Sequence, residues 1–141
     1  MGIVSPETVR IGGQASDKAD AIRQAGELLV QGGCVESGYV DGMLARESTM
    51  STYLGNGVAI PHGQNANRAQ IRRTGISVLQ LPGGVEWEPG EQVYLVIGIA
   101  ASADEHVGVL SNLAEIIEDP DMAMHLARVS DPHEIVQRLN G

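Results

Sequence analysis

Val93-Tyr94-Leu95-Val96-Ile97-Gly98-Ile99-Ala100-Ala101 is the longest near-apolar run of the chain, and it carries the strongest signal for the fold class. A run that is rich in Val and Ile and lacks polar alternation is typical of a strand covered on both faces. It is too short to cross a bilayer as a helix. Residues 93–101 therefore predict a central strand in a sheet that lies between layers of helices.

Further strands are expected on the N-terminal side of this run. Val58-Ala59-Ile60 predicts a short strand that Pro61 must stop, after a turn at Gly55-Asn56-Gly57. Residues 75–81 predict another strand, closed by the turn Pro82-Gly83-Gly84.

Helical patterns flank these strands. Apolar residues at three-and-four spacing predict helices near 17–31 and at about 38–47, with Ser16 and Ser37 as N-caps. A third helix follows the central run and reaches about Glu118, with its cap near Ser102 or Asp104. Its expected buried stripe consists of Leu110, Leu113, Ala114 and Ile117. Beyond Pro120 we expect a short helix with Met122 and Leu126, and a last helix opened by a capping box at Asp131-Pro132-His133-Glu134.

Alternating strands and helices without repeats or long linkers indicate one α/β unit. The predicted fold is a single domain over residues 1–141, with a mixed β-sheet flanked by helices on both faces. This length suffices to bury a core without disulfides or metal.

The composition excludes several classes of function. Eighteen acidic and nine basic side chains give a net charge of −9, and Lys18 is the only lysine. Because proteins that bind nucleic acid need clustered Lys and Arg, no nucleic-acid partner is expected. Aromatic residues make up 3% of the chain and Phe is absent, which argues against a wide pocket for a flat cofactor.

Cysteine usage and the N-terminus bear on the compartment. The single Cys34 excludes a disulfide framework and fits a reducing environment. The first residues show no basic segment followed by an apolar run, so no signal peptide is predicted. We expect a cytoplasmic protein without direct insertion into the membrane.

Nucleotide, zinc and serine motifs are missing, and histidine remains as the candidate for chemistry. The chain has no GxxxxGK[ST] loop, no HExxH pair and no GxSxG elbow. His62 follows the predicted strand end at Pro61, where ligands collect in open α/β sheets, and Gly63 leaves its ring uncrowded. A turn histidine without a role remains an equally good interpretation of this local pattern.

Two further residues are candidates for the site only if the fold brings them close to His62. His106 lies in the first turn of a predicted helix, where unpaired N–H groups favour an anion, although a histidine buried in the core is the plainer interpretation. Arg46 ends the second predicted helix and by default is solvated. His125 and His133 are expected to be surface residues.

Several segments resemble a known family. Gly57-Val58-Ala59-Ile60-Pro61-His62-Gly63 is similar to the phosphorylation-site signature of type-2 enzyme IIA proteins of the bacterial sugar phosphotransferase system. The resemblance extends over about residues 10–140 and is closest to the mannitol-specific branch. The further matching segments are Tyr39-Val40-x-x-Met43-Leu44-x-Arg46-Glu47, Tyr53-Leu54-Gly55, Thr74-Gly75, residues 95–101, Glu105-His106 and the tail from Leu126 to Leu139.

The resemblance implies a phosphoryl carrier of the mannitol/fructose enzyme IIA fold. His62 corresponds to the histidine that accepts phosphate from HPr and passes it to a cysteine of enzyme IIB, which acts with the membrane enzyme IIC. His106 and Arg46 correspond to the second histidine and the arginine of that site. No metal or cofactor is expected for this transfer. The enzyme IIB and IIC sequences are absent from the chain, so a freestanding or an excised enzyme IIA is expected.

This interpretation predicts details of the site. The neutral His62 should attack through Nε2 while a backbone carbonyl holds Nδ1–H, and Arg46 and His106 should stabilise the phosphoryl oxygens. Partners should bind at a modest surface with an apolar centre. Two alternatives remain open: a regulatory enzyme IIA of the fructose or nitrogen-related branch, and a nonenzymatic ligand-binding or interaction domain with structural histidines.

Overall fold

The near-apolar run forms β5 (Glu91–Ala100), the central strand of the sheet. The computed structural model describes residues 3–101 and 103–140, and it does not cover the side chains of residues 65, 66, 68, 103–106 and 140. Along β5, Leu95, Ile97 and Ile99 enter one apolar core, whereas Val96 and Ala100 enter the core on the opposite face. The prediction of a strand covered on both sides is confirmed.

In the described residues, five strands form one mixed sheet in the order β1-β4-β5-β3-β2. β5 pairs antiparallel with β4 on one side and parallel with β3 on the other. β1 runs parallel to β4 at one edge, and β2 runs antiparallel to β3 at the other. The outer four strands are β1 (Val9–Arg10), β2 (Tyr53–Gly55), β3 (Val58–Ala59) and β4 (Gly75–Glu88).

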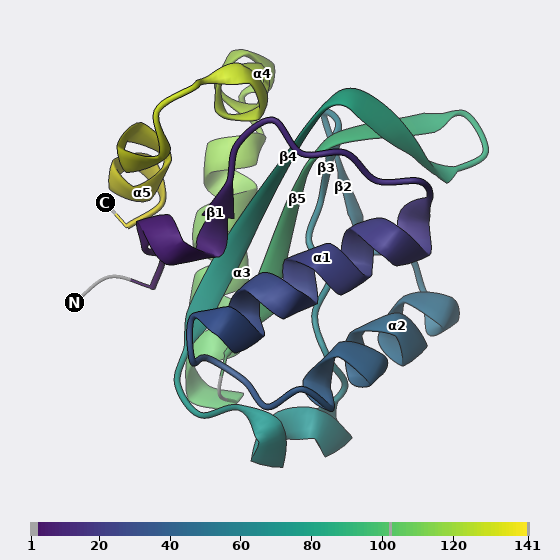
Figure 1. The fold of residues 1–141 in the computed structure, drawn as a ribbon, viewed down its shortest axis with the longest axis vertical. Coiled ribbons are helices and arrows are strands. Elements are labelled where there is room, and N and C mark those ends of the chain that lie inside the picture. Colours follow the sequence, from purple (N-terminus) through teal and green to yellow (C-terminus); the bar gives the residue numbers. More distant parts are fainter. Residues whose placement is uncertain (1–2, 102, 141) are drawn as a thin grey trace.

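Helices cover both faces of this sheet. The α-helices are α1 (Lys18–Gln31), α2 (Tyr39–Thr49), α3 (Ala103–Ile117), α4 (Pro120–Arg128) and α5 (Pro132–Asn140), and two short 3₁₀ helices are η1 (Pro6–Thr8) and η2 (Asn65–Gln70). α1 and α2 lie on one face (Figure 1), and α3, α4 and α5 contribute to the core on the other, with α4 against β4 and β5 and α5 beside β1. The predicted α/β arrangement is therefore confirmed.

Both predicted N-caps of the first two helices are wrong by one residue. Asp17 caps α1 by accepting a hydrogen bond from the Asp20 amide at 2.8 Å, while the Ser16 amide donates to the Asp20 carboxylate. α2 starts after Gly38 without any side-chain cap. A backbone turn replaces it, because the amide of Tyr39 donates to the Glu36 carbonyl.

The strand predicted at 75–81 does not end at Pro82. β4 continues to Glu88 through a shift in register between Gln80 and Val85, and pairing with β5 resumes beyond it. A proline is tolerated at such a bulge because the ladder is interrupted there. The strand actually turns back after Glu88, which pairs with Glu91.

The buried face of α3 is rotated from the predicted stripe. Leu113 and Ile117 are buried as expected, but Ala114 is exposed and Val109 takes part in the core. The predicted cap at Ser102 lies outside the described residues, and Asp104 lies within α3 rather than before it, because the helix begins at Ala103. Asp131 does cap the last helix, since its carboxylate accepts from the His133 amide.

In the described parts of the chain, no helix combines the length and apolar character needed to cross a bilayer.

Candidate functional site

His62 lies just beyond β3, where its backbone pairs with the central strand. The Ile99 amide of β5 donates to the Pro61 carbonyl at 2.9 Å, and His62 forms a parallel bridge with Ile99. This pairing places His62 at the carboxyl end of two neighbouring parallel strands, as the sequence predicts. Its side chain is half-buried.

One ring nitrogen of His62 is fixed by the backbone. Nδ1 lies 3.0 Å from the Ile60 carbonyl oxygen. A carbonyl can only accept a hydrogen bond, so Nδ1 carries the proton and the lone pair of the neutral ring is on Nε2. The prediction of an Nδ1–H held by a backbone carbonyl is confirmed.

The surroundings of His62 favour its neutral form. Burial lowers the pKa of the imidazole, and the positive charge of Arg46 lowers it further. The hydrogen bond to Ile60 and the negative charge of Glu47 act in the opposite direction, but the net shift is downward from 6.5. At neutral pH the ring is therefore uncharged and able to act as a nucleophile.

The Tyr39 hydroxyl holds the segment that carries His62. It donates to the Ile99 carbonyl at 2.8 Å and accepts from the Gly63 amide at 2.9 Å. Tyr39 is 2% exposed, and a Cβ at position 63 would lie 2.6 Å from its Cε1 atom. Only glycine at position 63 lets the ring approach the backbone this closely.

Arg46 comes to the site from the last turn of α2. Its Nη1 donates to the Met50 carbonyl at 2.8 Å, and its positive charge, after burial, contributes to the lowered pKa of the His62 imidazole. Arg46 is thus near enough to His62 for its charge to act on the imidazole, and its role in the site stays a prediction. The side chain of His106 lies outside the described residues, although its backbone belongs to the first turn of α3, a few residues after the bridge at Ile99.

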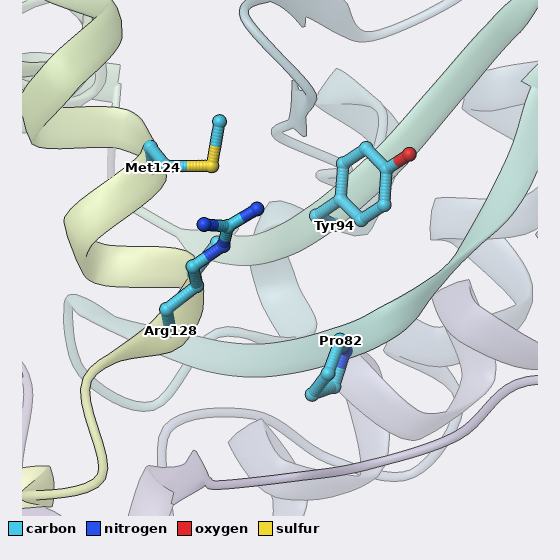
Figure 2. Close-up of a pocket in the computed structure, with 5 residues that line it drawn as sticks. Pro82, Tyr94, Met124 and Arg128 are labelled. Atoms are coloured by element: carbon cyan, nitrogen blue, oxygen red, sulfur yellow. The ribbon is translucent and has the colours of Figure 1, made fainter.

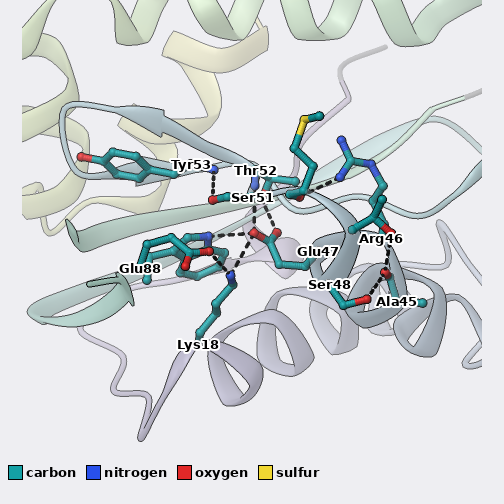
Figure 3. A network of polar contacts seen from close by, with 12 residues as sticks. Lys18, Ala45, Arg46, Glu47, Ser48, Ser51, Thr52, Tyr53 and Glu88 are labelled. Carbon is teal, nitrogen blue, oxygen red and sulfur yellow. Dashed lines mark hydrogen bonds and ion pairs between the residues drawn. The ribbon is translucent and has the colours of Figure 1, made fainter. Parts of the chain in front are cut away.

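A buried carboxylate follows Arg46 directly. Glu47 is 5% exposed and accepts hydrogen bonds from the Thr52 amide at 2.8 Å, the Thr52 hydroxyl at 2.5 Å and Trp87 Nε1 at 3.0 Å. The Lys18 ammonium lies 3.3 Å from the same carboxylate, and Glu88 binds Lys18 from the far side (Figure 3). This network ties α1, α2, β4 and the start of β2 together beside Arg46.

Local sequence patterns did not single out Tyr39 or Glu47 for a role in the site. A tyrosine at the start of a helix is typical of a core position, and a glutamate beside an arginine is typical of a solvated helix face. Their partners Gly63 and Trp87 are 24 and 40 residues away in sequence. Only the resemblance to a family included these residues.

Other parts of the molecule offer less for catalysis. In the described residues, no group of three or more His, Cys, Asp or Glu side chains is placed to hold a metal ion. An apolar hollow of about 210 Å³ lies between α4 and the β4-β5 ribbon (Figure 2). It is lined by Pro82, Tyr94, Met124, Ala127 and Arg128. Since Tyr94 precedes Ile99 by five residues on β5, this hollow is roughly 17 Å along the strand from the His62 bridge.

His125 in α4 and His133 in α5 are not part of this site. The His125 side chain is 41% exposed and contacts the Glu134 carboxylate, and His133 is exposed. Their predicted surface positions are confirmed.

Comparison with known proteins places this geometry in a family. Residues 2–141 match the family described as phosphoenolpyruvate-dependent sugar phosphotransferase system, EIIA 2. A mannitol-specific phosphotransferase enzyme IIA component of Geobacillus stearothermophilus is 37% identical over 99% of this chain and 97% of its own length. A multiphosphoryl transfer protein of Xanthomonas campestris is 49% identical over 98% of this chain, which spans only 16% of that protein.

Solved structures agree with this assignment. The crystal structure of IIA mannitol from Escherichia coli is 39% identical, with a TM-score of 0.88 over 96% of this chain and 97% of that one. Enzyme IIA mannitol in its complex with phosphorylated enzyme IIB mannitol from Escherichia coli gives a TM-score of 0.89 at 38% identity, over 96% of this chain and 95% of that one. The chain therefore belongs to the type-2 EIIA family of the phosphoenolpyruvate-dependent sugar phosphotransferase system.

Proposed function

We propose that this chain is a cytoplasmic phosphoryl carrier in which His62 takes a phosphoryl group from HPr and passes it to a cysteine of enzyme IIB, in the uptake of mannitol. The observation that carries the proposal is the hydrogen bond of Nδ1 to the Ile60 carbonyl, which puts the lone pair of the neutral ring on Nε2. The 37% identity to a mannitol-specific enzyme IIA over nearly the whole of both chains supports the choice of sugar.

The first transfer follows from this arrangement. The Nε2 lone pair of His62 attacks phosphorus, and the P–N bond of the donor phosphohistidine breaks with its electron pair left on the donor nitrogen. The Arg46 guanidinium offsets the negative charge that spreads over the three equatorial oxygens. By resemblance to the family, His106 is the second histidine of this site, and its backbone lies in the first turn of α3. Positioning and electrostatics thus supply the catalysis, without a metal or cofactor.

In the second transfer, His62 is the phosphoryl donor instead of the acceptor. A thiolate of enzyme IIB attacks the phosphorus, the Nε2–P bond breaks, and its electron pair returns to the imidazole. The membrane component enzyme IIC then uses the phosphorylated enzyme IIB. The complex solved for the Escherichia coli mannitol proteins, which contains phosphorylated enzyme IIB, supports enzyme IIB as the partner.

Exposed apolar side chains flank the elements that carry the site. Met50, whose carbonyl binds Arg46, is 66% exposed, and Val107, next to His106, is 71% exposed. Apolar residues at the centre of a polar surface are typical of transient protein interfaces. These two side chains are our candidates for the centre of the docking surface for HPr and enzyme IIB.

Reconstitution tests the proposal. The protein is incubated with phosphoenolpyruvate, enzyme I and HPr, and its intact mass is measured. We expect a gain of one phosphoryl group in the wild type and none in His62→Ala. A wild-type protein that gains no phosphoryl group would support a nonenzymatic interaction domain instead.

Adding enzyme IIB separates a transport component from a regulatory one. We expect rapid loss of phosphate from the protein when mannitol enzyme IIB is present. Phosphate that persists in the presence of mannitol and fructose enzyme IIB proteins would favour the regulatory alternative. In this assay His106→Ala is expected to slow uptake or to block onward transfer.

A further inference from the structure

Glu47 is a buried charge that phosphoryl transfer does not directly use. It is the only buried carboxylate in the part of the chain that the structure describes. Burial of a carboxylate is unfavourable by several kcal/mol unless hydrogen bonds and an opposite charge compensate. Three hydrogen bonds and the Lys18 ammonium do so here.

Hydrogen bonds connect this carboxylate to the imidazole of His62. Glu47 accepts from both the amide and the hydroxyl of Thr52. The Thr52 carbonyl accepts from the Ile60 amide at 3.0 Å, and the Ile60 carbonyl is the group that lies 3.0 Å from His62 Nδ1. Ile60, whose carbonyl orients the histidine, is therefore tied to Glu47 through its own amide and a single intervening residue, Thr52.

The same segment also supports Arg46. The Met50 carbonyl accepts from Arg46 Nη1, and the Thr52 amide, two residues further on, donates to the Glu47 carboxylate. Neighbouring side chains of α2 thus hold residues 50–52 at both ends, and Figure 3 shows both of them reaching this segment. A change in its position would displace the guanidinium and the orienting carbonyl together.

The charge of Glu47 acts on His62 as well. It raises the pKa of the imidazole, in opposition to burial and to Arg46, which lower it. Removing the charge is expected to move the titration of His62 to lower pH. Removing the hydrogen bonds is expected to free the ring from its fixed tautomer.

Resting on the proposed function, we propose that Glu47 is a positioning residue for phosphoryl transfer, which holds the Ile60 carbonyl and the Arg46 guanidinium in register with His62 through Thr52.

Two variants separate position from charge. Glu47→Gln keeps an oxygen for the Thr52 amide and Trp87 and offers an amide to the Thr52 hydroxyl, but it carries no charge. Glu47→Ala removes the charge and the hydrogen bonds. Glu88→Gln is the matched control, because Glu88 binds the same Lys18 ammonium at 2.6 Å without contact to Thr52.

The tautomer and titration of His62 are measured by nitrogen-15 NMR on the unphosphorylated proteins, and phosphoryl uptake from HPr is measured above the pKa of His62. Wild type, Glu47→Gln and Glu88→Gln should show a single Nδ1–H tautomer. Glu47→Ala should show mixed tautomers and uptake that is about 10- to 100-fold slower, since a displacement of 1 Å can have an effect of that size. Only the Gln variant at position 47 should retain the tautomer while its titration midpoint falls.

A folded Glu47→Ala protein with one tautomer and wild-type uptake would overturn the proposal. If Glu47→Ala does not fold, Thr52→Val replaces it, because this variant removes one of the two bonds to the carboxylate. A single tautomer and unchanged uptake in Thr52→Val would then overturn the proposal in the same way. Failure of wild-type uptake would refute the phosphoryl carrier and leave the NMR test of positioning intact.

Discussion

Tyr39→Phe removes one buried oxygen and with it two hydrogen bonds that hold the His62 segment. The hydroxyl joins the Gly63 amide to the Ile99 carbonyl, at 2.9 and 2.8 Å. Each backbone group left without its partner in the interior destabilises the fold by about 1–3 kcal/mol. With two such groups, the expected loss in the free energy of unfolding is about 2–6 kcal/mol.

Urea unfolding followed by circular dichroism measures this loss. With a slope of about 2 kcal/mol/M, the midpoint of Tyr39→Phe should fall by about 1–3 M. Tyr94→Phe is the matched control, since the Tyr94 hydroxyl has no hydrogen-bond partner in the described residues and its side chain is 40% exposed. The control should stay within about 0.5 kcal/mol of the wild type.

A Tyr39→Phe protein as stable as Tyr94→Phe would refute the reasoning, because it would mean that the hydroxyl does not hold Gly63. The variant should also take up phosphate more slowly, since Gly63 follows His62 directly. Wild-type uptake in a variant of reduced stability would show that the hydroxyl supports the fold and leaves His62 in place without it.

Three further predictions concern the same site. Because burial and Arg46 lower the pKa of His62, its NMR titration should have a midpoint below about 6.5. As the pH falls, the imidazole is therefore protonated in the unfolded chain before it is protonated in the folded one. The stability that the neutral imidazole contributes is present above pH 6.5 and is lost as the pH falls through the folded pKa. Arg46→Gln should raise the midpoint of the His62 titration and slow phosphoryl uptake by about 10²–10³-fold. An unchanged midpoint would mean that the charge of Arg46 does not act on the imidazole. Gly63→Ala should lower stability by about 1–3 kcal/mol in thermal unfolding, whereas Gly83→Ala, where a Cβ meets nothing within 4 Å, should not, and equal effects would contradict the close approach of Tyr39.

Local signals predicted the central strand and the place of His62. The apolar run of β5 and the strand end at Pro61 depend only on neighbouring residues, so both can be recognised in a single sequence. The anchor on Nδ1 was also predictable, because the Ile60 carbonyl is only two residues from the ring.

Local sequence patterns did not predict the contacts between residues far apart in the chain. The apparent turn at Pro82-Gly83-Gly84 is overridden by pairing with β5, which carries β4 on to Glu88. Glu47 is buried because Trp87 lies against it, 40 residues away, and nothing near Glu47 in the sequence indicates this. The predicted caps failed for a different, local reason, since a backbone turn at Glu36 and the carboxylates of Asp17 and Asp20 took the place of the two serine side chains.

The position of phosphorus on the imidazole ring tests the central claim most directly. The protein is labelled with nitrogen-15 in its histidines, phosphorylated by phosphoenolpyruvate, enzyme I and HPr, and examined by NMR for coupling between phosphorus and nitrogen. We predict coupling to Nε2 of His62, with the proton retained on Nδ1. Coupling to Nδ1, or to a histidine that persists in His62→Ala, would contradict the account.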